Sequence, residues 1–300
     1  PGTRLRQPPA TLEEKNGVLT VTAGDLVVEA SGKAGTLTSL RHKGVEFLVS
    51  GPRVNIWRAA TDNDGIKAWT GQESKPLGRW RKAGLPEFQV TGRGVSATRN
   101  KDGSVTLSFQ SVATARGGKI GHHHSYTVHP NGEIVVENDF ACDRTLPDLP
   151  RLGVTFILRP DFEHLVWFGR GPHESYCDRK RGAAVGLYRG TVTGQYVPYI
   201  VPQEHGNKTD VRWMELADPR GRAIVFAATD RLLECSASHF TANDLYAAAH
   251  TIDLTPRREI IVNLDYAQRG LGTASCGPDT LERYLLPPDD YWFGYRIQFR

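Results

Sequence analysis

Polar and aromatic side chains with the chemistry of a binding site are concentrated between residues 199 and 213. This segment combines carboxylate, imidazole, amide, guanidinium and indole groups, and it has few apolar residues whose presence packing would explain. A binding or interface role and plain exposure to solvent both fit this composition. The candidate side chains are Glu204, His205, Asn207, Asp210, Arg212 and Trp213.

A second polar loop covers residues 57–65 and contains Asp62, Asn63 and Asp64 in a row. Two carboxylates and an amide can hold sugar hydroxyls or a hard cation. The same residue types are frequent in turns, where their side chains bond to nearby backbone, and for this loop alone that interpretation is favoured. Trp69 and Trp80 follow, and their rings fit either stacking on a pyranose or a place in the core.

Two further clusters have alternative interpretations. Residues 167–179 carry His, Glu, Asp and Arg around a Gly-Pro turn, which fits acid–base work or a corner held by ion pairs. His122 and His124 would share one face of a strand, but no nearby carboxylate or cysteine completes a tetrahedral metal site. We therefore expect no metal site on this chain.

Catalytic patterns are missing from the sequence. There is no Gly-x-Ser-x-Gly nucleophile elbow, and no local context suggests a Ser, His and Asp set. Glycoside hydrolysis needs two carboxylates at a defined separation, and no pair is singled out by its surroundings. We predict no catalytic residue on this chain, so the residues alone indicate a domain with sugar-compatible loops.

The elements that position these loops are predicted to be β-strands. Apolar and polar residues alternate with a period of two, as in residues 104–109, and turn residues separate such segments. Residues 18–30 predict a hairpin, and Asn131-Gly132 predicts another. One helix is expected at residues 241–250, with Thr241 as its N-cap. Many short strands and no long helix predict an all-β sandwich or barrel.

Composition and charge exclude several classes of protein. The net charge of +4 comes from Lys and Arg residues scattered among nearly as many acids, which argues against a nucleic-acid partner. No apolar run approaches the length of a membrane span. Four widely spaced cysteines without a Cys-x-x-Cys pair disfavour a zinc ribbon and a disulfide scaffold, and they favour the reducing cytoplasm.

The chain is expected to contain one domain. Residues 1–17 predict a linker from a preceding domain, and residues 18–300 predict the domain itself. The sequence has a single methionine, Met214, and begins with Pro1. We therefore interpret it as an excised or processed piece of a longer protein.

These motifs, in this order, resemble the C-terminal or "small chain" domain of the β-galactosidases of glycoside hydrolase family two. The resemblance spans about residues 18–299, and several motifs in the family's order are more specific than any single one. They are Thr61-Asp62-Asn63-Asp64, the turn at 80–84, Trp167-Phe168-Gly169-x-Gly171-Pro172-x-Glu174-x-Tyr176-x-Asp178-Arg179, Pro202-Gln203-Glu204-x-Gly206-Asn207, Asp210-Val211-Arg212-Trp213, Ser238-His239-Phe240 and residues 270–278.

The resemblance implies a supersandwich, in which two large antiparallel sheets pack face to face, of the kind shared with galactose mutarotases. It implies a part of an enzyme for the retaining hydrolysis of terminal β-D-galactosides such as lactose. In that family the catalytic glutamates lie on a preceding (β/α)8 barrel, and the acid–base glutamate belongs to an Asn-Glu pair. No Asn-Glu pair occurs here, so the isolated chain is expected to be inactive.

The resemblance also implies a role at the active-site rim. In better-known members a Ser-Trp segment brings its tryptophan to the rim, where it stacks on the sugar. The corresponding pair here is Ser275-Cys276, a departure that argues against an aromatic platform on this chain. Ser275, Cys276 and the loop from Asp62 to Asp64 are the remaining rim candidates.

The implied partners are the remaining domains or large subunit of the enzyme, galactoside sugars, and further copies in an oligomer. No nucleic acid or membrane partner is expected. No cofactor is expected on this chain either, because the Mg and Na that the full-length family often uses belong to other domains. Two alternatives remain open. One is a freestanding carbohydrate-binding module that uses a concave sheet lined by Glu204, His205, Asp210, Arg212 and Trp213. The other is a mutarotase-like epimerase that uses a His and a Glu.

Overall fold

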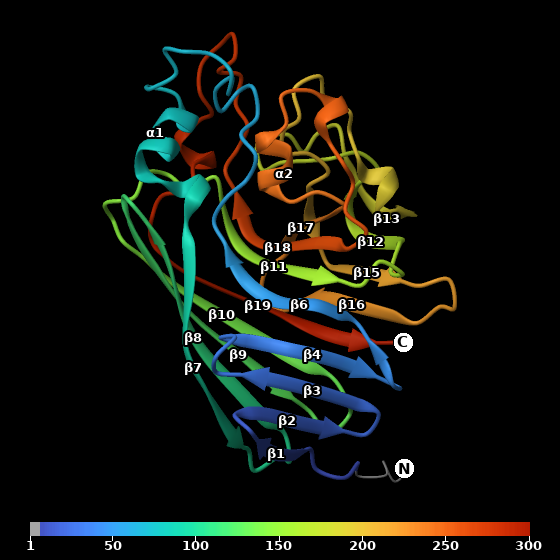
Figure 1. The fold of residues 1–300 in the computed structure, drawn as a ribbon. Coiled ribbons are helices and arrows are strands. Elements are labelled where there is room, and N and C mark those ends of the chain that lie inside the picture. The colour runs from blue at the N-terminus through green and yellow to red at the C-terminus, as the bar shows by residue number, and fades with distance from the viewer. Residues whose placement is uncertain (1–6) are drawn as a thin grey trace.

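Alternation of apolar and polar residues produces the strands of this protein. In β8 (Val105–Ala115), Val105, Leu107 and Phe109 are buried, and the residues between them are partly exposed. Because successive side chains of a strand point to opposite faces, one face of β8 enters the core. The structure is a computed structural model that describes residues 7–300, and in this range nineteen strands pair antiparallel (Figure 1).

The strands form three sheets. The nine-stranded sheet has the order β13 (Ala184–Thr191), β12 (His164–Gly171), β15 (Trp213–Ala217), β16 (Ala223–Ala228), β19 (Asp290–Phe299), β10 (Ile134–Cys142), β9 (Gly118–Val128), β8 and β7 (Gln89–Arg99). The N-terminal sheet has the order β1 (Thr11–Lys15), β2 (Val18–Ala23), β3 (Leu26–Ser31), β4 (Thr36–His42) and β5 (Val45–Glu46). The third sheet, here the β11 sheet, has the order β14 (Lys208–Val211), β17 (Leu233–Ser238), β18 (Ile260–Gln268), β11 (Arg151–Leu158) and β6 (Leu48–Asn55).

The two five-stranded sheets lie side by side and face the nine-stranded sheet. They meet at β4 and β6, where the Thr36 hydroxyl donates to the Pro52 carbonyl at 2.6 Å (Figure 1). Across the layers, Phe156 of β11 packs on Phe226 of β16, with ring centroids 5.1 Å apart. The predicted pair of large antiparallel layers is confirmed, and one of the layers is divided into two sheets.

Most local predictions are confirmed. The hairpin predicted at residues 18–30 is formed by β2 and β3, and Asn131-Gly132 turns the chain between β9 and β10. The helix predicted over residues 241–250 is α2 (Ala242–Ala247), which ends three residues before His250. Its N-terminus is a capping box, in which the Thr241 hydroxyl accepts from the Asp244 backbone N–H and the Asp244 carboxylate accepts from the Thr241 N–H.

The predicted linker over residues 1–17 is wrong from residue 11 onward. Thr11–Lys15 forms β1, which pairs with β2 along its whole length. Its side chains are mostly exposed because it is the edge strand of the N-terminal sheet, so its composition resembles that of a linker. Residues 1–6 of the predicted linker lie outside the described residues.

The helix α1 (Pro76–Ala83) was not predicted, because only a turn at residues 80–84 was expected in this region. Pro76 stands in the first turn and Gly84 ends the helix with φ +72°, which are typical start and stop signals. Leu77 and Trp80 of α1 are buried. Within residues 7–300 the chain also forms four 3₁₀ turns: η1 (Leu85–Glu87), η2 (Thr193–Gln195), η3 (Thr251–Asp253) and η4 (Glu282–Tyr284).

Candidate functional site

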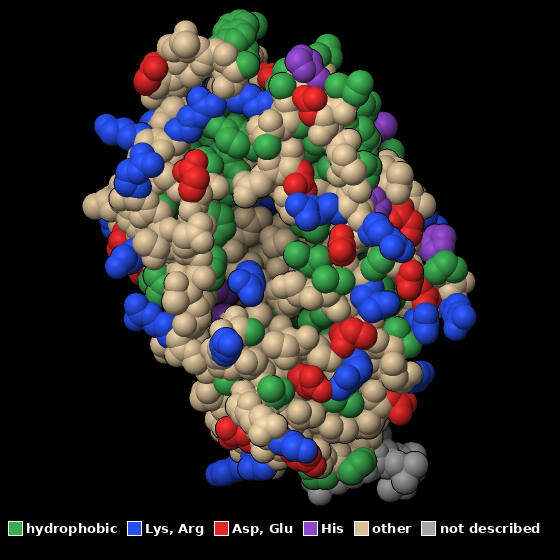
Figure 2. All heavy atoms as spheres, viewed as in Figure 1, with side chains coloured by type: hydrophobic (Ala, Val, Ile, Leu, Met, Phe, Trp, Pro, Cys, Tyr) green, Lys and Arg blue, Asp and Glu red, His purple; other side chains and the backbone are tan. Residues whose placement is uncertain are grey.

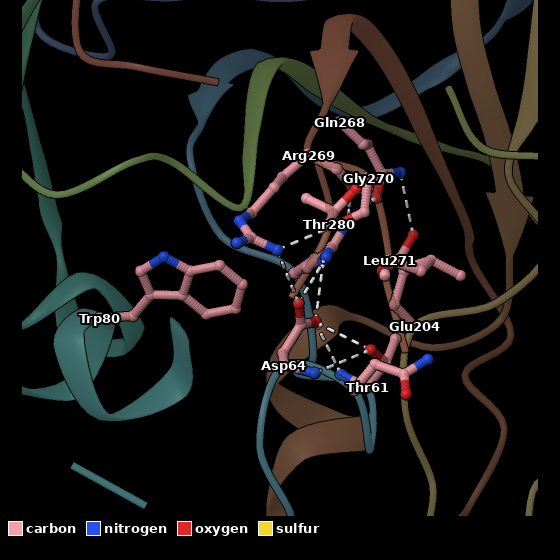
Figure 3. Close-up of polar contacts among 12 residues, drawn as sticks. Thr61, Asp64, Trp80, Glu204, Gln268, Arg269, Gly270, Leu271 and Thr280 are labelled. Carbon is pink, nitrogen blue, oxygen red and sulfur yellow. Dashed lines mark hydrogen bonds and ion pairs between the residues drawn. The ribbon is translucent and has the colours of Figure 1, made fainter. Parts of the chain in front are cut away.

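Asp64 anchors its loop from inside the protein. Its carboxylate accepts two hydrogen bonds from Arg58, at 2.7 and 3.2 Å, and both side chains are fully buried. The backbone N–H and the hydroxyl of Thr61 donate to the same carboxylate at 2.9 and 3.0 Å. Figure 3 shows Asp64 directed at Thr61 and Arg269. Asp64 therefore shapes the loop, and its place as a rim residue is not supported by this geometry.

Asn63 reaches from the same loop to the 270–280 segment. Its Oδ1 accepts from the Ser275 hydroxyl at 2.8 Å and from the Ser275 backbone N–H at 3.2 Å. Asp62, Ser275 and Cys276 are exposed, and Asn63 is half-buried. The structure thus brings together the two loops that the sequence suggested for a rim, and we call Asp62, Asn63, Ser275 and Cys276 the rim tip.

Charged side chains also anchor the 270–280 loop on the side of Ser275 and Cys276. The Asp178 carboxylate accepts from the backbone N–H groups of Leu271 and Gly272, at 3.1 and 2.8 Å. Arg269 donates to both oxygens of Asp279 at 2.8 Å. Asp178 was a candidate for acid–base work or for an ion-paired corner, and it serves as an anchor for the 270–280 loop.

Glu174, the other carboxylate of segment 167–179, is also occupied. It accepts from the Tyr199 hydroxyl at 2.5 Å and from the Gly206 backbone N–H at 2.7 Å. Burial and this hydrogen bond raise the pKa of Tyr199. Glu174 therefore links the corner to the 199–213 segment.

The 199–213 segment does not form one cluster. Glu204 and His205 are buried beside the β11 sheet, whereas Asn207 is fully buried and donates to the Ser175 carbonyl at 3.0 Å and to Glu234 at 2.9 Å. Gly206, with φ +78°, lies between them. Asn207 is therefore a buried support, and it is not exposed to a ligand.

Asp210, Arg212 and Trp213 lie in a different environment. Asp210 pairs with Arg170 at 2.5 Å and with Lys180 at 2.6 Å. Arg212 donates to the Asp210 carbonyl at 2.6 Å, and Trp213 is half-buried on β15 of the nine-stranded sheet. The carbohydrate-module alternative placed these three residues beside Glu204 and His205. Glu204 and His205 line a cleft, but these three residues do not line it.

That cleft, here the sheet cleft, lies on the face of the β11 sheet that points away from the core. It has a volume of about 350 Å³, and Figure 2 shows this face of the molecule hollowed over β6, β11 and β18. Its polar floor was missed by the sequence analysis. The sequence does contain a signal for this floor, because each of four largely apolar strands carries a polar residue that lines the cleft. These residues are Asn55, Thr155, Ser236 and Asn263.

A buried ionic network lies at one end of the sheet cleft. Arg151 donates twice to Asp265, at 2.7 and 3.1 Å, and lies 3.6 Å from Glu204. Gln268 donates to Glu204 at 3.2 Å. Burial raises the pKa of Asp265 to about 6, against the lowering effect of Arg151, and burial raises the pKa of Glu234 to about 7.

The remaining candidates are part of the core or of the surface. Trp80 is buried and Trp69 is exposed, so Trp80 does not serve as a sugar platform. His122 and His124 share one face of β9, as expected, and stack at 4.4 Å inside the core. Desolvation lowers the pKa of His122 to about 4. Within residues 7–300, no group of three or more His, Cys, Asp or Glu side chains has the arrangement of a metal site.

The four cysteines are unpaired. Cys142 and Cys235 are buried, Cys177 is half-buried and Cys276 is exposed. Burial raises the pKa of the Cys142 thiol to about 11 and that of Cys177 to about 12, so both remain protonated thiols at neutral pH. No helix among residues 7–300 has the length and apolarity needed to span a membrane.

Comparison with known proteins identifies the family. The family described as "Beta galactosidase small chain" matches residues 22–297. The chain belongs to this family. This small-chain domain is 33% identical over 276 residues to the β-galactosidase of Priestia megaterium, covering 91% of this chain and 25% of that protein. It is 28% identical over 277 residues to the β-galactosidase of Kluyveromyces lactis, covering 88% and 25%.

The small-chain domain therefore spans about a quarter of the length of the curated relatives that it matches. Among solved structures, it is similar to a putative aldose 1-epimerase from Escherichia coli K12, with a TM-score of 0.48 and 11% identity over 97% of this chain and 99% of that chain. A galactose 1-epimerase from Lactobacillus acidophilus NCFM gives a TM-score of 0.44 and 9% identity, over 97% and 98% of the two chains.

Proposed function

We propose that this small-chain domain completes the active-site wall of a β-galactosidase, which hydrolyses terminal β-D-galactosides at carboxylates located elsewhere in the enzyme. The observation that carries the proposal is the hydrogen-bonded contact between Asn63 and Ser275. It joins two exposed loops into one tip, and each loop is anchored by a carboxylate, the buried Asp64 or the half-buried Asp178.

The chemistry of the rim tip fits positioning of substrate and not bond cleavage. Retaining hydrolysis needs two carboxyl groups about 5 Å apart. Asp62 is the one carboxylate of the rim tip, and Asp64 beside it is neutralised by Arg58 inside the protein. The rim tip offers an amide, a hydroxyl and a thiol, which orient a sugar and exclude water.

An exposed apolar surface supports docking onto the rest of the enzyme or onto further copies of it. β13 is an edge strand of the nine-stranded sheet, and it exposes Val185 and Leu187. Ile200, in the segment that follows, is 85% exposed. Edge strands and contiguous apolar residues at a surface are typical of interaction sites.

The cellular setting belongs to the same proposal. Unpaired cysteines support a reducing compartment, the cytoplasm. We assign no cofactor to this chain, and any Mg or Na that the enzyme uses would be held by its other domains.

The test is kinetic and uses the complete enzyme, with this domain joined to the remaining parts. Ser275→Ala removes the shorter contact to Asn63, so we expect KM for a nitrophenyl β-galactoside to rise about three- to tenfold, as one lost hydrogen bond predicts. Ser74→Ala changes another exposed serine, before α1, and should leave KM unchanged. Equal KM values in both variants would remove the rim tip from the active-site wall.

Cys276→Trp is a gain-of-contact test at the same tip. An indole beside Ser275 would stack on the sugar, and a stacking contact is worth roughly 0.5–1.5 kcal/mol. We expect KM to fall about two- to tenfold, whereas Cys276→Ser should leave it unchanged. No difference between the two variants would place Cys276 away from the sugar.

A further inference from the structure

The sheet cleft contains two buried ring nitrogens that lack a hydrogen-bond partner. Trp57 and His205 are 2% and 6% exposed, and both side chains line the sheet cleft. Trp57 Nε1 and His205 Nε2 have no partner among the described residues. Buried polar groups are nearly always paired, and each unpaired group costs about 1–3 kcal/mol.

The two nitrogens differ in what they need. The indole Nε1–H of Trp57 is a donor only. His205 Nδ1 lies 3.0 Å from the Gln203 carbonyl, which only accepts, so in the neutral ring this nitrogen carries the hydrogen and Nε2 is left as an acceptor. One donor and one acceptor are therefore unsatisfied on two side chains that line the same cleft. A hydroxyl group accepts and donates, and molecules with several hydroxyls supply both partners.

The floor of the sheet cleft is prearranged for neutral polar groups. Asn263 Oδ1 accepts from the Thr155 hydroxyl at 2.6 Å and from Asn55 Nδ2 at 3.1 Å. Asn263 Nδ2 donates to the Ser236 hydroxyl at 3.1 Å. These side chains fix one another on adjacent strands, so a ligand would meet them already ordered, which lowers the entropic cost of binding.

Charge and shape narrow the class of ligand. Arg151 is paired with Asp265 and lies close to Glu204, so the end of the cleft offers no free buried cation to a phosphate or carboxylate. Arg53 also lines the cleft, but its side chain is exposed and its charge is screened by water. Phe88 and Phe240 supply apolar wall that suits the C–H face of a pyranose. The volume of about 350 Å³ lies at the small end of ligand pockets, which span roughly 300–1,000 Å³.

From these contacts we propose that the sheet cleft binds a neutral monosaccharide, held by Trp57, His205 and the amide and hydroxyl groups of the floor. None of the rim-tip residues lines the cleft. The proposal therefore stands or falls independently of the rim.

The test measures D-galactose binding to the 300-residue chain by saturation-transfer NMR and calorimetric titration. Trp57→Phe removes the unpaired N–H together with the five-membered ring, so we expect affinity to weaken about three- to tenfold and thermal stability to fall, because the side chain is buried. His205→Phe, which removes the acceptor, should weaken binding by a similar factor.

Trp80→Phe is the matched control. The Trp80 N–H is also buried, but it donates to the Asp148 carbonyl at 2.7 Å and does not line the cleft. This variant should lose thermal stability and keep its affinity for galactose. Circular dichroism would establish that each variant is folded before its binding is measured.

Two results would overturn the proposal. One is the absence of saturation transfer and heat from wild-type protein with galactose or glucose, which would mean that water alone fills the cleft. The other is equal affinity in wild type and in folded Trp57→Phe and His205→Phe. Neither result changes the kinetics expected for the rim-tip variants, so failure here is distinguishable from failure of the proposed function.

Discussion

Asp62 and Asp64 are two positions apart and have different physical roles. Asp62 is exposed at the rim tip, whereas Asp64 is fully buried with Arg58. Sequence alone gave both carboxylates the same candidate role, since local composition does not reveal which partner a side chain will meet. The partner is Arg58, six residues earlier, whose own side chain is held by the Arg269 carbonyl.

Asp64→Asn should be strongly destabilising. The substitution leaves the buried Arg58 without its counter-charge, and removing one partner of a buried ion pair costs about 3–5 kcal/mol. Asp62→Asn, at an exposed site, should change the free energy of unfolding by less than about 0.5 kcal/mol. Urea unfolding of both variants measures the difference, and equal stabilities would mean that Asp64 does not anchor the loop.

Glu234 should make stability depend on pH. Burial raises its pKa from 4.5 to about 7, so the folded protein binds a proton that the unfolded chain has already released. The free energy of unfolding should therefore fall as pH rises from about 4.5 to about 7, by roughly 3 kcal/mol for this group.

Glu234→Gln, in which the side-chain oxygen still accepts from Asn207, should flatten that dependence. The slope that remains below about pH 6 would come from Asp265, whose pKa is also raised by burial. Glu73→Gln, at an exposed site, should keep the wild-type slope. Denaturant unfolding at several pH values is the measurement, and an unchanged slope in Glu234→Gln would contradict the assignment.

Among the elements, the C-terminus of α1 packs against the turn between β8 and β9. Gly84 has φ +72°, and a Cβ placed there would lie 3.1 Å from the backbone nitrogen of Arg116. The helix buries Trp80, which packs edge-on against Trp57 at 6.1 Å. α1 thus packs against Trp57, the first residue of the loop that carries Asp62 and Asn63.

Gly84→Ala should destabilise the protein more than Gly71→Ala. Both glycines have φ +72°, but a Cβ at Gly71 meets no atom within 4 Å. The left-handed conformation alone costs about 1–2 kcal/mol in each variant, and the close approach to Arg116 adds to this only at Gly84. Thermal unfolding compares the two, and equal losses would mean that the helix end can shift freely.

Elements with a local signal were predicted well, and elements that depend on distant partners were not. The α2 capping box and the turn at Asn131-Gly132 are encoded within a few residues. An exposed edge strand and a linker have similar polar compositions, so the sequence of β1 predicted a linker. Only the pairing of β1 with β2 distinguishes the two. The sheet cleft was missed for the same reason, since its floor joins Asn55 to Asn263 across 208 positions.

At the scale of the whole molecule, one hydrophobic core serves all three sheets. Val28 of the N-terminal sheet, Phe156 of the β11 sheet and Ile297 of the nine-stranded sheet belong to the same buried cluster. The loops and the outer face of the β11 sheet lie outside this core, and Figure 2 shows the hollow over that sheet. The three sheets therefore form one packed support for the rim tip and the sheet cleft.

We propose that this domain belongs to a β-galactosidase and does not supply its catalytic carboxylates. The most direct measurement is hydrolysis of nitrophenyl β-D-galactoside by the purified 300-residue chain, beside the complete enzyme that contains it. We expect no turnover by the chain alone, turnover by the complete enzyme, and loss of that turnover when this domain is omitted. Turnover by the chain alone that survives purification and disappears on substitution of one of its own carboxylates would contradict the claim.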